Sequence, residues 1–269
     1  MKLNLTGRAV FITGASKGIG RATAAAFAKA GASYIAVGAR SSLDGTVADI
    51  KKAASEAKRK EPKILALSND VSDQKSCEAA AAEISKEFGK LDILINNAGF
   101  MEKTAKVAEA DPMEWWSVWE INVKGVFLTT RAILPILLKT EGGLKIILGI
   151  SSLGALRTRP GAAAYQLSKM VVLRFAQFLD AEYGDQGLIA YGVHPGGVPT
   201  ELASNADKEL LSRLTDSPDL GANTMVWLTS EPRKWLQGRF VSVNWDMEEL
   251  MAMREEIEKG DLLKYRLRT

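Results

Sequence analysis

Short apolar runs alternate with helix-forming segments along almost the whole chain. The runs are apolar at successive positions rather than at every second one, which is typical of parallel strands covered on both faces. This alternation predicts an α/β fold, a doubly wound parallel sheet with helices on both faces. The predicted strands are 9–12, 34–39, 64–67, 93–95, 144–150, 189–193 and 240–243, and the predicted helices are 19–30, 45–60, 73–88, 112–139, 162–183 and 220–229.

A chain of 269 residues is long enough for one sizeable α/β domain with a full core. No repeat, low-complexity segment or linker interrupts it, so residues 1–269 are expected to form a single domain. Residues 244–269 are expected to be a C-terminal extension of that domain, helical over 246–258. The extension is expected to pack on the substrate pocket, across a subunit interface, or on the surface of its own domain.

Composition excludes several classes of function. The formal net charge of +3 is too small to indicate nucleic-acid or membrane binding. The single cysteine, Cys77, excludes an intramolecular disulfide and a cysteine-rich metal site, and no other metal-ligand cluster is visible. No secretory signal pattern and no apolar run of about 18 residues is found, so a cytoplasmic location is expected.

A glycine-rich turn follows the first predicted strand and opens the first predicted helix. Glycines allow a tight turn and close approach of the backbone to a pyrophosphate, while the helix N-terminus offers free N–H groups. This context predicts a dinucleotide site. Its candidate cofactor-binding residues are Gly14, Ser16, Lys17, Gly18, Ile19 and Gly20.

The end of the second predicted strand indicates which dinucleotide is bound. An acidic residue there would bind the ribose 2′-hydroxyl of NAD. The chain instead has Arg40, with Lys17 nearby in the glycine-rich turn, and Asp44 comes too late to bind the ribose. Because basic side chains form charge-assisted bonds to phosphate, the sequence favours NADP(H).

Tyr165 and Lys169 stand four residues apart on a predicted helix, and Ser152 lies thirteen residues upstream of Tyr165. Residues at i and i+4 share one helix face. A fixed ammonium beside a phenol is expected to lower the phenol pKa, which would make Tyr165 a proton donor and acceptor near neutral pH. Alone, such a pair is more often a surface pair, and it gains weight here from the motifs around it.

Further motifs accompany this pair along the chain. In order, the segments are Thr13-Gly14-x-x-x-Gly18-Ile19-Gly20, Asn96-Asn97-Ala98-Gly99, Asn122, Ser152, Tyr165-x-x-x-Lys169 and Pro195-Gly196-Gly197-Val198-Pro199-Thr200. Together they resemble the short-chain dehydrogenase/reductase family, and the match runs over about residues 5–243. The resemblance implies a Rossmann-type sheet of seven parallel strands. The chain also resembles the fungal reductases of secondary metabolism within that family.

The resemblance implies a role for each matching residue. Tyr165 would protonate a carbonyl oxygen, Lys169 would lower its pKa and bind the nicotinamide ribose, Ser152 would bond the substrate oxygen, and Asn122 would help to hold a water linked to Lys169. Asp70 and Val71 would contact adenine, Asn97 would support the central strand and contact ribose, and Val198 and Thr200 would fix the carboxamide. Ala98, Gly99, Pro195 and Gly196 complete the candidate cofactor site.

The implied activity is NADPH-dependent reduction of the carbonyl group of a fairly bulky, apolar small molecule, or the reverse oxidation. Two alternatives stay open: imine reduction, isomerisation or cyclisation with bound NADP(H), and a non-catalytic dinucleotide-binding regulator. The intact Ser152, Tyr165 and Lys169 argue against the regulator. The resemblance also implies a homodimer or homotetramer built on the helices 112–139 and 162–183.

Several further side chains lie near the expected site. His194 is expected to have a structural or positioning role. Trp115 and Trp119 are expected to be core or subunit-contact aromatics. Arg157 and Arg159 are expected either to be exposed or to pair with an acidic group of the substrate. The candidate pocket residues are Phe100, Met101, Leu153, Leu156, Arg157 and Leu202.

Overall fold

The computed structural model describes residues 3–267. Seven parallel strands form one sheet in the order β3-β2-β1-β4-β5-β6-β7. The predicted doubly wound sheet is therefore confirmed. The strand order reverses between β1 and β4, which is where sheets of this kind bind ligands. The strands are β1 (Ala9–Thr13), β2 (Tyr34–Ala39), β3 (Lys63–Ser68), β4 (Ile93–Asn96), β5 (Ile146–Ile150), β6 (Ile189–His194) and β7 (Phe240–Ser242).

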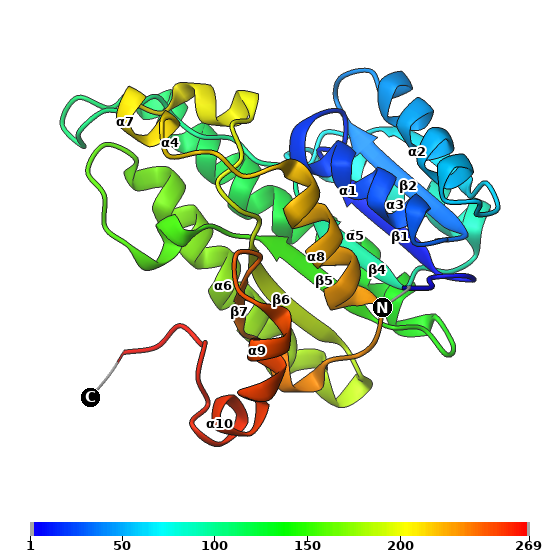
Figure 1. The fold of residues 1–269 in the computed structure, drawn as a ribbon. Helices are drawn as coiled ribbons and strands as arrows, with labels where there is room; N and C mark the ends of the chain where they lie inside the picture. The colour runs from blue at the N-terminus through cyan, green and yellow to red at the C-terminus, as the bar shows by residue number, and fades with distance from the viewer. Residues whose placement is uncertain (1–2, 268–269) are drawn as a thin grey trace.

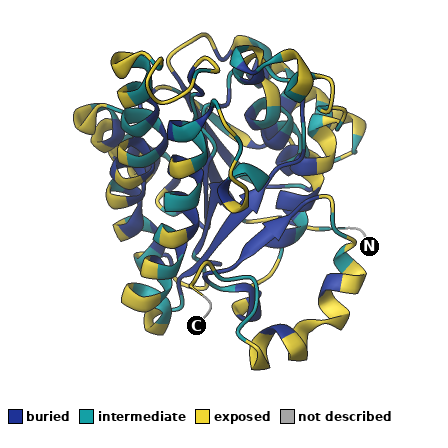
Figure 2. Cartoon of the chain, turned by 90° about the vertical axis from the view of Figure 1, so that its left-hand side faces the viewer, coloured by how far each residue is buried: buried dark blue, intermediate teal, exposed yellow. Residues whose placement is uncertain are grey.

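Helices cover both faces of the sheet (Figure 1). One core cluster holds side chains of α1, α2 and α8, and a second holds side chains of α3, α5 and α6. The strands between these layers are largely buried (Figure 2). The helices are α1 (Gly18–Lys29), α2 (Asp44–Glu56), α3 (Gln74–Phe88), α4 (Pro112–Trp119), α5 (Gly125–Lys139), α6 (Ala163–Tyr183), α7 (Lys208–Leu211), α8 (Pro218–Thr229), α9 (Met247–Ala252) and α10 (Arg254–Lys259).

The predicted helix 112–139 is not one regular helix. Asp111 caps its start by accepting bonds from Met113 N and Glu114 N. A π-helical turn, η1 (Glu120–Lys124), then separates α4 from α5. Such turns are rare and are frequently found at functional sites. This one carries Asn122, which is fully buried.

By length and composition alone, the stretch Pro112–Lys139 is apolar enough to cross a membrane, which corrects the expectation that no segment is. Half of its most apolar window is buried in the fold. Ile133, Leu134 and Leu137 belong to the core beneath the sheet. The apolar character of this stretch is therefore explained by its packing in the core.

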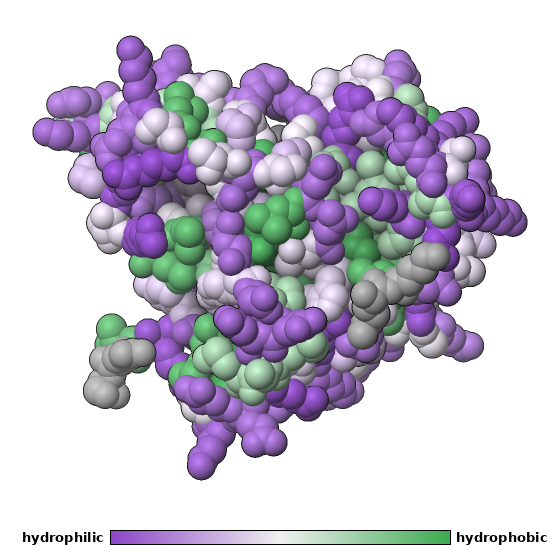
Figure 3. Space-filling view, viewed as in Figure 1, coloured by the Kyte–Doolittle hydropathy of each residue, from purple (hydrophilic) through white to green (hydrophobic). Residues whose placement is uncertain are grey.

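The C-terminal extension packs on its own domain. It forms the two short helices α9 and α10 rather than one helix over 246–258. Leu250 and Ile257 are buried in the same core cluster as α1 and α8. Figure 1 places α9 and α10 at the end of the molecule away from α7. The surface of this view is mostly hydrophilic, with apolar patches near its middle and over the extension (Figure 3).

Candidate active site

The glycine-rich turn fits a dinucleotide because its glycines lie where a larger residue would be strained or would clash. Gly14 and Gly18 have φ values of +63° and +55°, in the left-handed region that favours glycine. A Cβ at Gly14 would lie 2.7 Å from the Cα of Ala98. The turn is thus pressed against the Asn97-Ala98-Gly99 segment, which brings the two predicted motifs together.

Asn97 ties these two segments to each other. Its side-chain amide donates to the carbonyl oxygens of Thr13 at 2.8 Å and Gly14 at 3.1 Å. The Thr13 hydroxyl accepts from the backbone N–H groups of Asn97 and Ala98, both at 3.1 Å. Asn97 therefore holds the end of β1 against the end of β4, and its expected contact with ribose stays a prediction.

The N-terminus of α1 is suited to an anion. Lys17 stands at its N-cap with extended backbone and makes no capping bond with its side chain, and the first turn contains no acidic residue. Free N–H groups and the positive end of the helix dipole favour a phosphate there. The residues of the turn therefore fit the pyrophosphate of a nicotinamide dinucleotide.

The side chains expected around the adenosine half lie at the ends of β2 and β3. Arg40 is exposed directly after β2. Burial opposes ionisation of Asp70, but bonds from Ser72 and the charges of Arg40 and Lys124 lower its pKa on balance. The Asn69 carboxamide oxygen is buried beside Gly38 and has no partner within the described part of the chain. An unsatisfied acceptor at these strand ends is consistent with a site for a polar group.

Lys17 does not point at a free phosphate site in this structure. Its ammonium lies 2.6 Å from the Glu201 carboxylate, which follows Thr200. Both side chains are exposed, so the pair contributes about 0–1 kcal/mol and is easily exchanged for another partner. The prediction that Lys17 adds charge for a 2′-phosphate therefore stays a prediction.

Three of the four predicted catalytic side chains, those of Ser152, Tyr165 and Lys169, lie at the carboxyl end of β5 and the start of α6. Ser152 follows β5, and its hydroxyl accepts from Gly154 N at 3.0 Å. The same hydroxyl lies near the Tyr165 phenol, close enough to lower its pKa. Lys169 Nζ lies 5.5 Å from the centroid of the Tyr165 ring and donates to the Ile150 carbonyl oxygen at 2.9 Å.

The prediction that the Tyr165 pKa is lowered is wrong, because this pKa is raised above its ordinary value. Burial raises the pKa of Tyr165 to about 12 and outweighs the nearby Ser152 hydroxyl, which lowers it, while the Glu102 charge raises it further. Burial also lowers the pKa of Lys169 to about 8. Desolvation is the largest cause of both shifts, and Lys169 is not among the groups that shift the Tyr165 pKa. Tyr165 is thus a protonated acid at neutral pH.

Asn122 joins the loop after β4 to α6. Its carboxamide oxygen accepts from Phe100 N at 2.8 Å, and its amide donates to Phe100 O at 2.9 Å and to the Ser168 hydroxyl at 3.0 Å. Both ends of the side chain are therefore engaged within the protein. Its implied part in a water link to Lys169 stays a prediction.

Glu102 is a site residue that the sequence analysis missed. It is only 4% exposed, and its two carboxylate oxygens accept from the Tyr165 backbone N–H at 3.2 and 3.1 Å. Its sequence signal is weak, because 63 residues separate it from Tyr165. Only the fold places this acid at the start of α6.

An apolar cover lies over Tyr165. Met101 and Ala206 belong to a small buried cluster, and Tyr165, Leu202 and Leu210 are partly buried against it. Asn205 Nδ2 donates to the Met101 carbonyl oxygen at 2.7 Å, which links the cover to the loop after β4. Met101 and Leu202 are therefore brought to the site as predicted.

Other predicted pocket residues are placed elsewhere. Leu153 packs with a separate cluster that contains Phe240, and Leu156 is 49% exposed. Arg159 forms an ion pair with Asp207 at 2.7 Å, so it is not free to bind an acidic substrate. This ion pair instead ties the loop before α6 to the start of α7.

The loop after β6 crosses the glycine-rich turn. A Cβ at Gly18 would lie 3.2 Å from Thr200 Cγ2. Gly196 has a φ of +92°, and Val198 is buried. The loop thus lies beside the turn, as its expected contact with a cofactor requires.

His194 has the predicted positioning role. Its Nδ1 accepts from Leu153 N at 3.3 Å, next to Ser152. Burial lowers its pKa to about 4, so the ring is neutral and can accept this bond. His194 therefore helps to hold the Ser152 loop.

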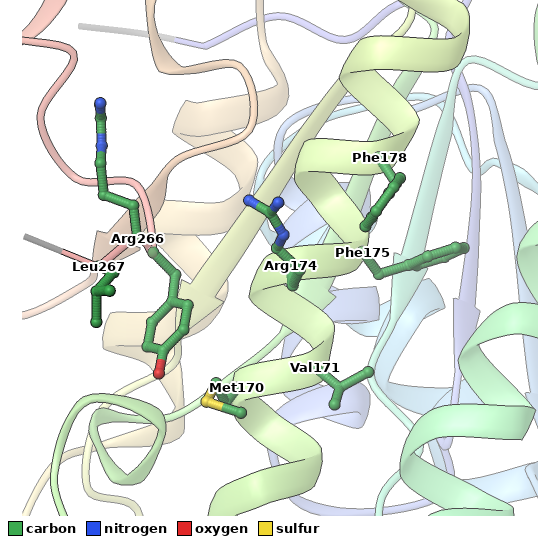
Figure 4. A pocket seen from close by; sticks show the side chains of 8 residues that line it. Met170, Val171, Arg174, Phe175, Phe178, Arg266 and Leu267 are labelled. Atoms are coloured by element: carbon green, nitrogen blue, oxygen red, sulfur yellow. The ribbon is translucent and has the colours of Figure 1, made fainter.

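A cavity of about 500 Å³ lies outside this site, between α6 and residues 265–267 (Figure 4). Its lining includes Met170, Arg174, Phe178 and Tyr265, and none of the catalytic side chains. Within residues 3–267, no group of His, Cys, Asp and Glu side chains could hold a metal ion.

The sequence matches the family model of the short chain dehydrogenases over residues 8–211. It is 54% identical over 261 residues to the short chain dehydrogenase mpl6 of Monascus purpureus, with 97% of this chain and 89% of that protein covered. This fungal relative agrees with the resemblance noted from the motifs.

Solved structures have the same fold. The 3-ketoacyl-(acyl-carrier-protein) reductase from Brucella melitensis, complexed with NADH, is similar with a TM-score of 0.78 and 28% identity, covering 89% of this chain and 98% of that one. A short chain dehydrogenase from Shigella flexneri, complexed with NADP, is similar with a TM-score of 0.78 and 27% identity, covering 91% and 100%. Since the two hold different dinucleotides, similarity alone does not choose between them.

Proposed function

Because the chain belongs to the short-chain dehydrogenase family, we propose that this oxidoreductase uses NADP(H) to reduce a carbonyl group of a fairly bulky, apolar small molecule, or to catalyse the reverse oxidation. One observation carries the proposal: Lys169 lies 5.5 Å from the Tyr165 ring centroid and within 3.5 Å of a Cβ placed at Gly99, in the segment that is pressed against the glycine-rich turn.

Each catalytic side chain has a defined task in this reaction. A bound nicotinamide would supply the hydride. Tyr165 donates its proton to the carbonyl oxygen, and Ser152 hydrogen-bonds that oxygen as negative charge develops. The Lys169 ammonium, 5.5 Å from the centroid of the Tyr165 ring, stabilises the phenolate that forms when Tyr165 gives up its proton. Its pKa of about 8 keeps it mostly charged at pH 7.

The preference for NADP(H) rests on the end of β2. Arg40 is exposed there, and no acidic residue occupies the place where a ribose ligand of NAD would stand. The charge of Arg40 reaches Asp70, which lies at the neighbouring strand end. Arg40 would therefore bind a 2′-phosphate in the space between these strands.

The substrate class rests on the cover over Tyr165. Met101, Leu202, Ala206 and Leu210 present apolar surface to this end of the site. Burial against such surface favours an apolar body over a charged one. Of the two arginines that the sequence suggested for an acidic substrate, Arg159 is already paired with Asp207 and Arg157 is exposed.

A panel of ketones, imines and alcohols tests the proposal. The expected result is loss of NADPH absorbance with bulky apolar ketones and little loss with charged ones. Turnover of imines alone would replace carbonyl reduction by imine reduction. Conversion of a substrate without net cofactor consumption would indicate isomerisation or cyclisation, and cofactor binding without any turnover would indicate a regulator.

A substitution of Arg40 tests the cofactor preference. Arg40→Ala is expected to weaken NADPH binding about tenfold or more while leaving NADH binding nearly unchanged, since one charge-assisted bond to phosphate is lost. Lys51→Ala, which removes an exposed cation from α2, is the matched control. Equal losses for both dinucleotides in Arg40→Ala would refute the phosphate assignment.

We also propose that the chain forms a homodimer or homotetramer through α4, α5 and α6. In support, Trp116, Phe127 and Phe178 on these helices are 57%, 50% and 52% exposed. Sedimentation should then give a dimer or larger. Phe178→Glu should shift it toward the monomer, and a monomeric unaltered chain would contradict the proposal.

A further inference from the structure

The first turn of α6 takes its acidic partner from a distant part of the chain. Ala162, at the N-cap, has no side chain that could accept a bond, and the first turn has no acidic residue. Glu102 fills this place, with both carboxylate oxygens within 3.2 Å of Tyr165 N. A carboxylate at a helix N-terminus is stabilised by the free N–H groups and by the helix dipole.

We propose that Glu102 is a positioning residue for the proton donor: it fixes the backbone of Tyr165 so that the phenol faces Ser152, and its negative charge favours donation of the phenolic proton over its withdrawal. This inference rests on the proposed role of Tyr165. It concerns a residue that touches neither the glycine-rich turn nor Ser152.

The segment that carries Glu102 is held firmly on both sides. Phe100 makes two backbone bonds to Asn122, and the Met101 carbonyl oxygen accepts from Asn205. On the other side, Lys103 N donates to Glu114 at 3.2 Å. Glu102 is therefore fixed by its neighbours and not by its own bond alone, so its side chain can be altered without releasing the loop.

Burial makes the Glu102 charge effective. The carboxylate is 4% exposed, and a charge acts more strongly where water is excluded. The groups that act on Tyr165 are the Ser152 hydroxyl from the end of β5, the Lys169 ammonium from α6, which lies over the ring, and the Glu102 carboxylate from the loop after β4, which accepts from the Tyr165 backbone N–H. Of these, Glu102 is the group whose charge raises the Tyr165 pKa.

Two substitutions separate position from charge. Glu102→Gln keeps an oxygen that can accept from Tyr165 N but removes the charge, whereas Glu102→Ala removes both. Glu114→Gln is the matched control, because it removes a nearby carboxylate that pairs with Lys103 and does not face the phenol.

Ultraviolet difference titration of the phenol tests the charge without any substrate. The chain has five tyrosines, so the Tyr165 signal is taken as the difference between each variant and the same variant carrying Tyr165→Phe. Glu102→Gln should lower the midpoint of the Tyr165 titration by about one unit, and Glu114→Gln should leave it in place. An unchanged midpoint in Glu102→Gln would overturn the inference.

The pH profile of the holoenzyme tests the consequence for catalysis. Reduction needs the protonated phenol, so the alkaline limb of kcat/KM should move to lower pH by about one unit in Glu102→Gln. The limb for alcohol oxidation should move to lower pH by the same amount. Glu102→Ala should in addition lower kcat about tenfold, because the first turn of α6 loses its anchor.

The two readouts keep this inference apart from the proposed function. A shifted titration with no turnover of any carbonyl compound would support the effect of Glu102 on the phenol and reject the reductase. Turnover with identical pH profiles in Glu102→Gln and the unaltered chain would keep the reductase and reject the role of Glu102.

Discussion

Gly20 offers a sharp test of how the dinucleotide turn is built. It lies in the first turn of α1, where an added Cβ would be 2.4 Å from Asn97 Nδ2 and 2.7 Å from the Gly14 carbonyl oxygen. That Asn97 amide makes the two bonds that join the glycine-rich turn to the end of β4. Gly20→Ala must therefore displace Asn97 or move the turn itself.

The size of the effect follows from these contacts. Two lost hydrogen bonds cost about 1–3 kcal/mol in total, and a methyl group forced into a packed contact costs about 1–3 kcal/mol more. The better helix propensity of alanine offsets about 1 kcal/mol. Gly20→Ala should thus lower the free energy of unfolding by about 1–5 kcal/mol and weaken NADPH binding by a factor on the order of ten.

Urea denaturation and fluorescence titration with NADPH measure both effects. Gly45→Ala is the matched control, because Gly45 also lies in the first turn of a helix but its Cβ would meet only the flexible end of Arg21, at 2.9 Å. It should be neutral or stabilising by up to about 1 kcal/mol. If Gly20→Ala matched Gly45→Ala in urea midpoint and bound NADPH normally, the account of the turn would be wrong.

Three further predictions concern the cap of α4, the buried histidine and the cover of the site. Asp111→Ala should lower the free energy of unfolding by about 1 kcal/mol, because two N–H groups of α4 lose their acceptor; an unchanged urea midpoint would contradict this. His194 has a pKa of about 4 in the fold against an ordinary 6.5, so the unfolded chain binds the proton first and stability should fall by about 3 kcal/mol between pH 6.5 and 4. His194→Gln should remove that part of the pH dependence, measured by urea midpoints at each pH. Asp207→Ala should raise KM for the carbonyl substrate more than it lowers kcat, because α7 loses both its cap and its ion pair to Arg159; a change confined to kcat would place the cover outside substrate binding.

The sequence predicts the sheet well because each strand has its own local run of apolar residues. All seven predicted strands are present, since runs such as 34–39 and 189–193 must be apolar at every position to be buried on both faces. The strand predicted to begin at 144 begins at Ile146, because Lys145 adopts a φ of +51°. The helix predicted over 45–60 ends at Glu56, just before Lys58 with a φ of +53°.

The features that escape prediction depend on distant parts of the chain. Glu102 becomes a helix partner only when the loop after β4 meets the start of α6. The π-helical turn that carries Asn122 occurs together with hydrogen bonds between Asn122 and Phe100, and the periodicity of the sequence indicates neither feature. The sign of the Tyr165 pKa shift was wrong because burial depends on the cover formed by Leu202, Ala206 and Leu210.

The central claim, that Tyr165 donates the proton in a reduction driven by NADPH, is tested most directly by Tyr165→Phe. The measurement is single-turnover loss of NADPH absorbance with the best ketone of the panel, beside NADPH affinity by fluorescence titration. The phenyl ring keeps the packing and loses only the acid, so the rate should fall by a factor on the order of 100–10,000 while NADPH affinity stays within about twofold. A rate that survives the substitution, with NADPH still bound, would contradict the claim.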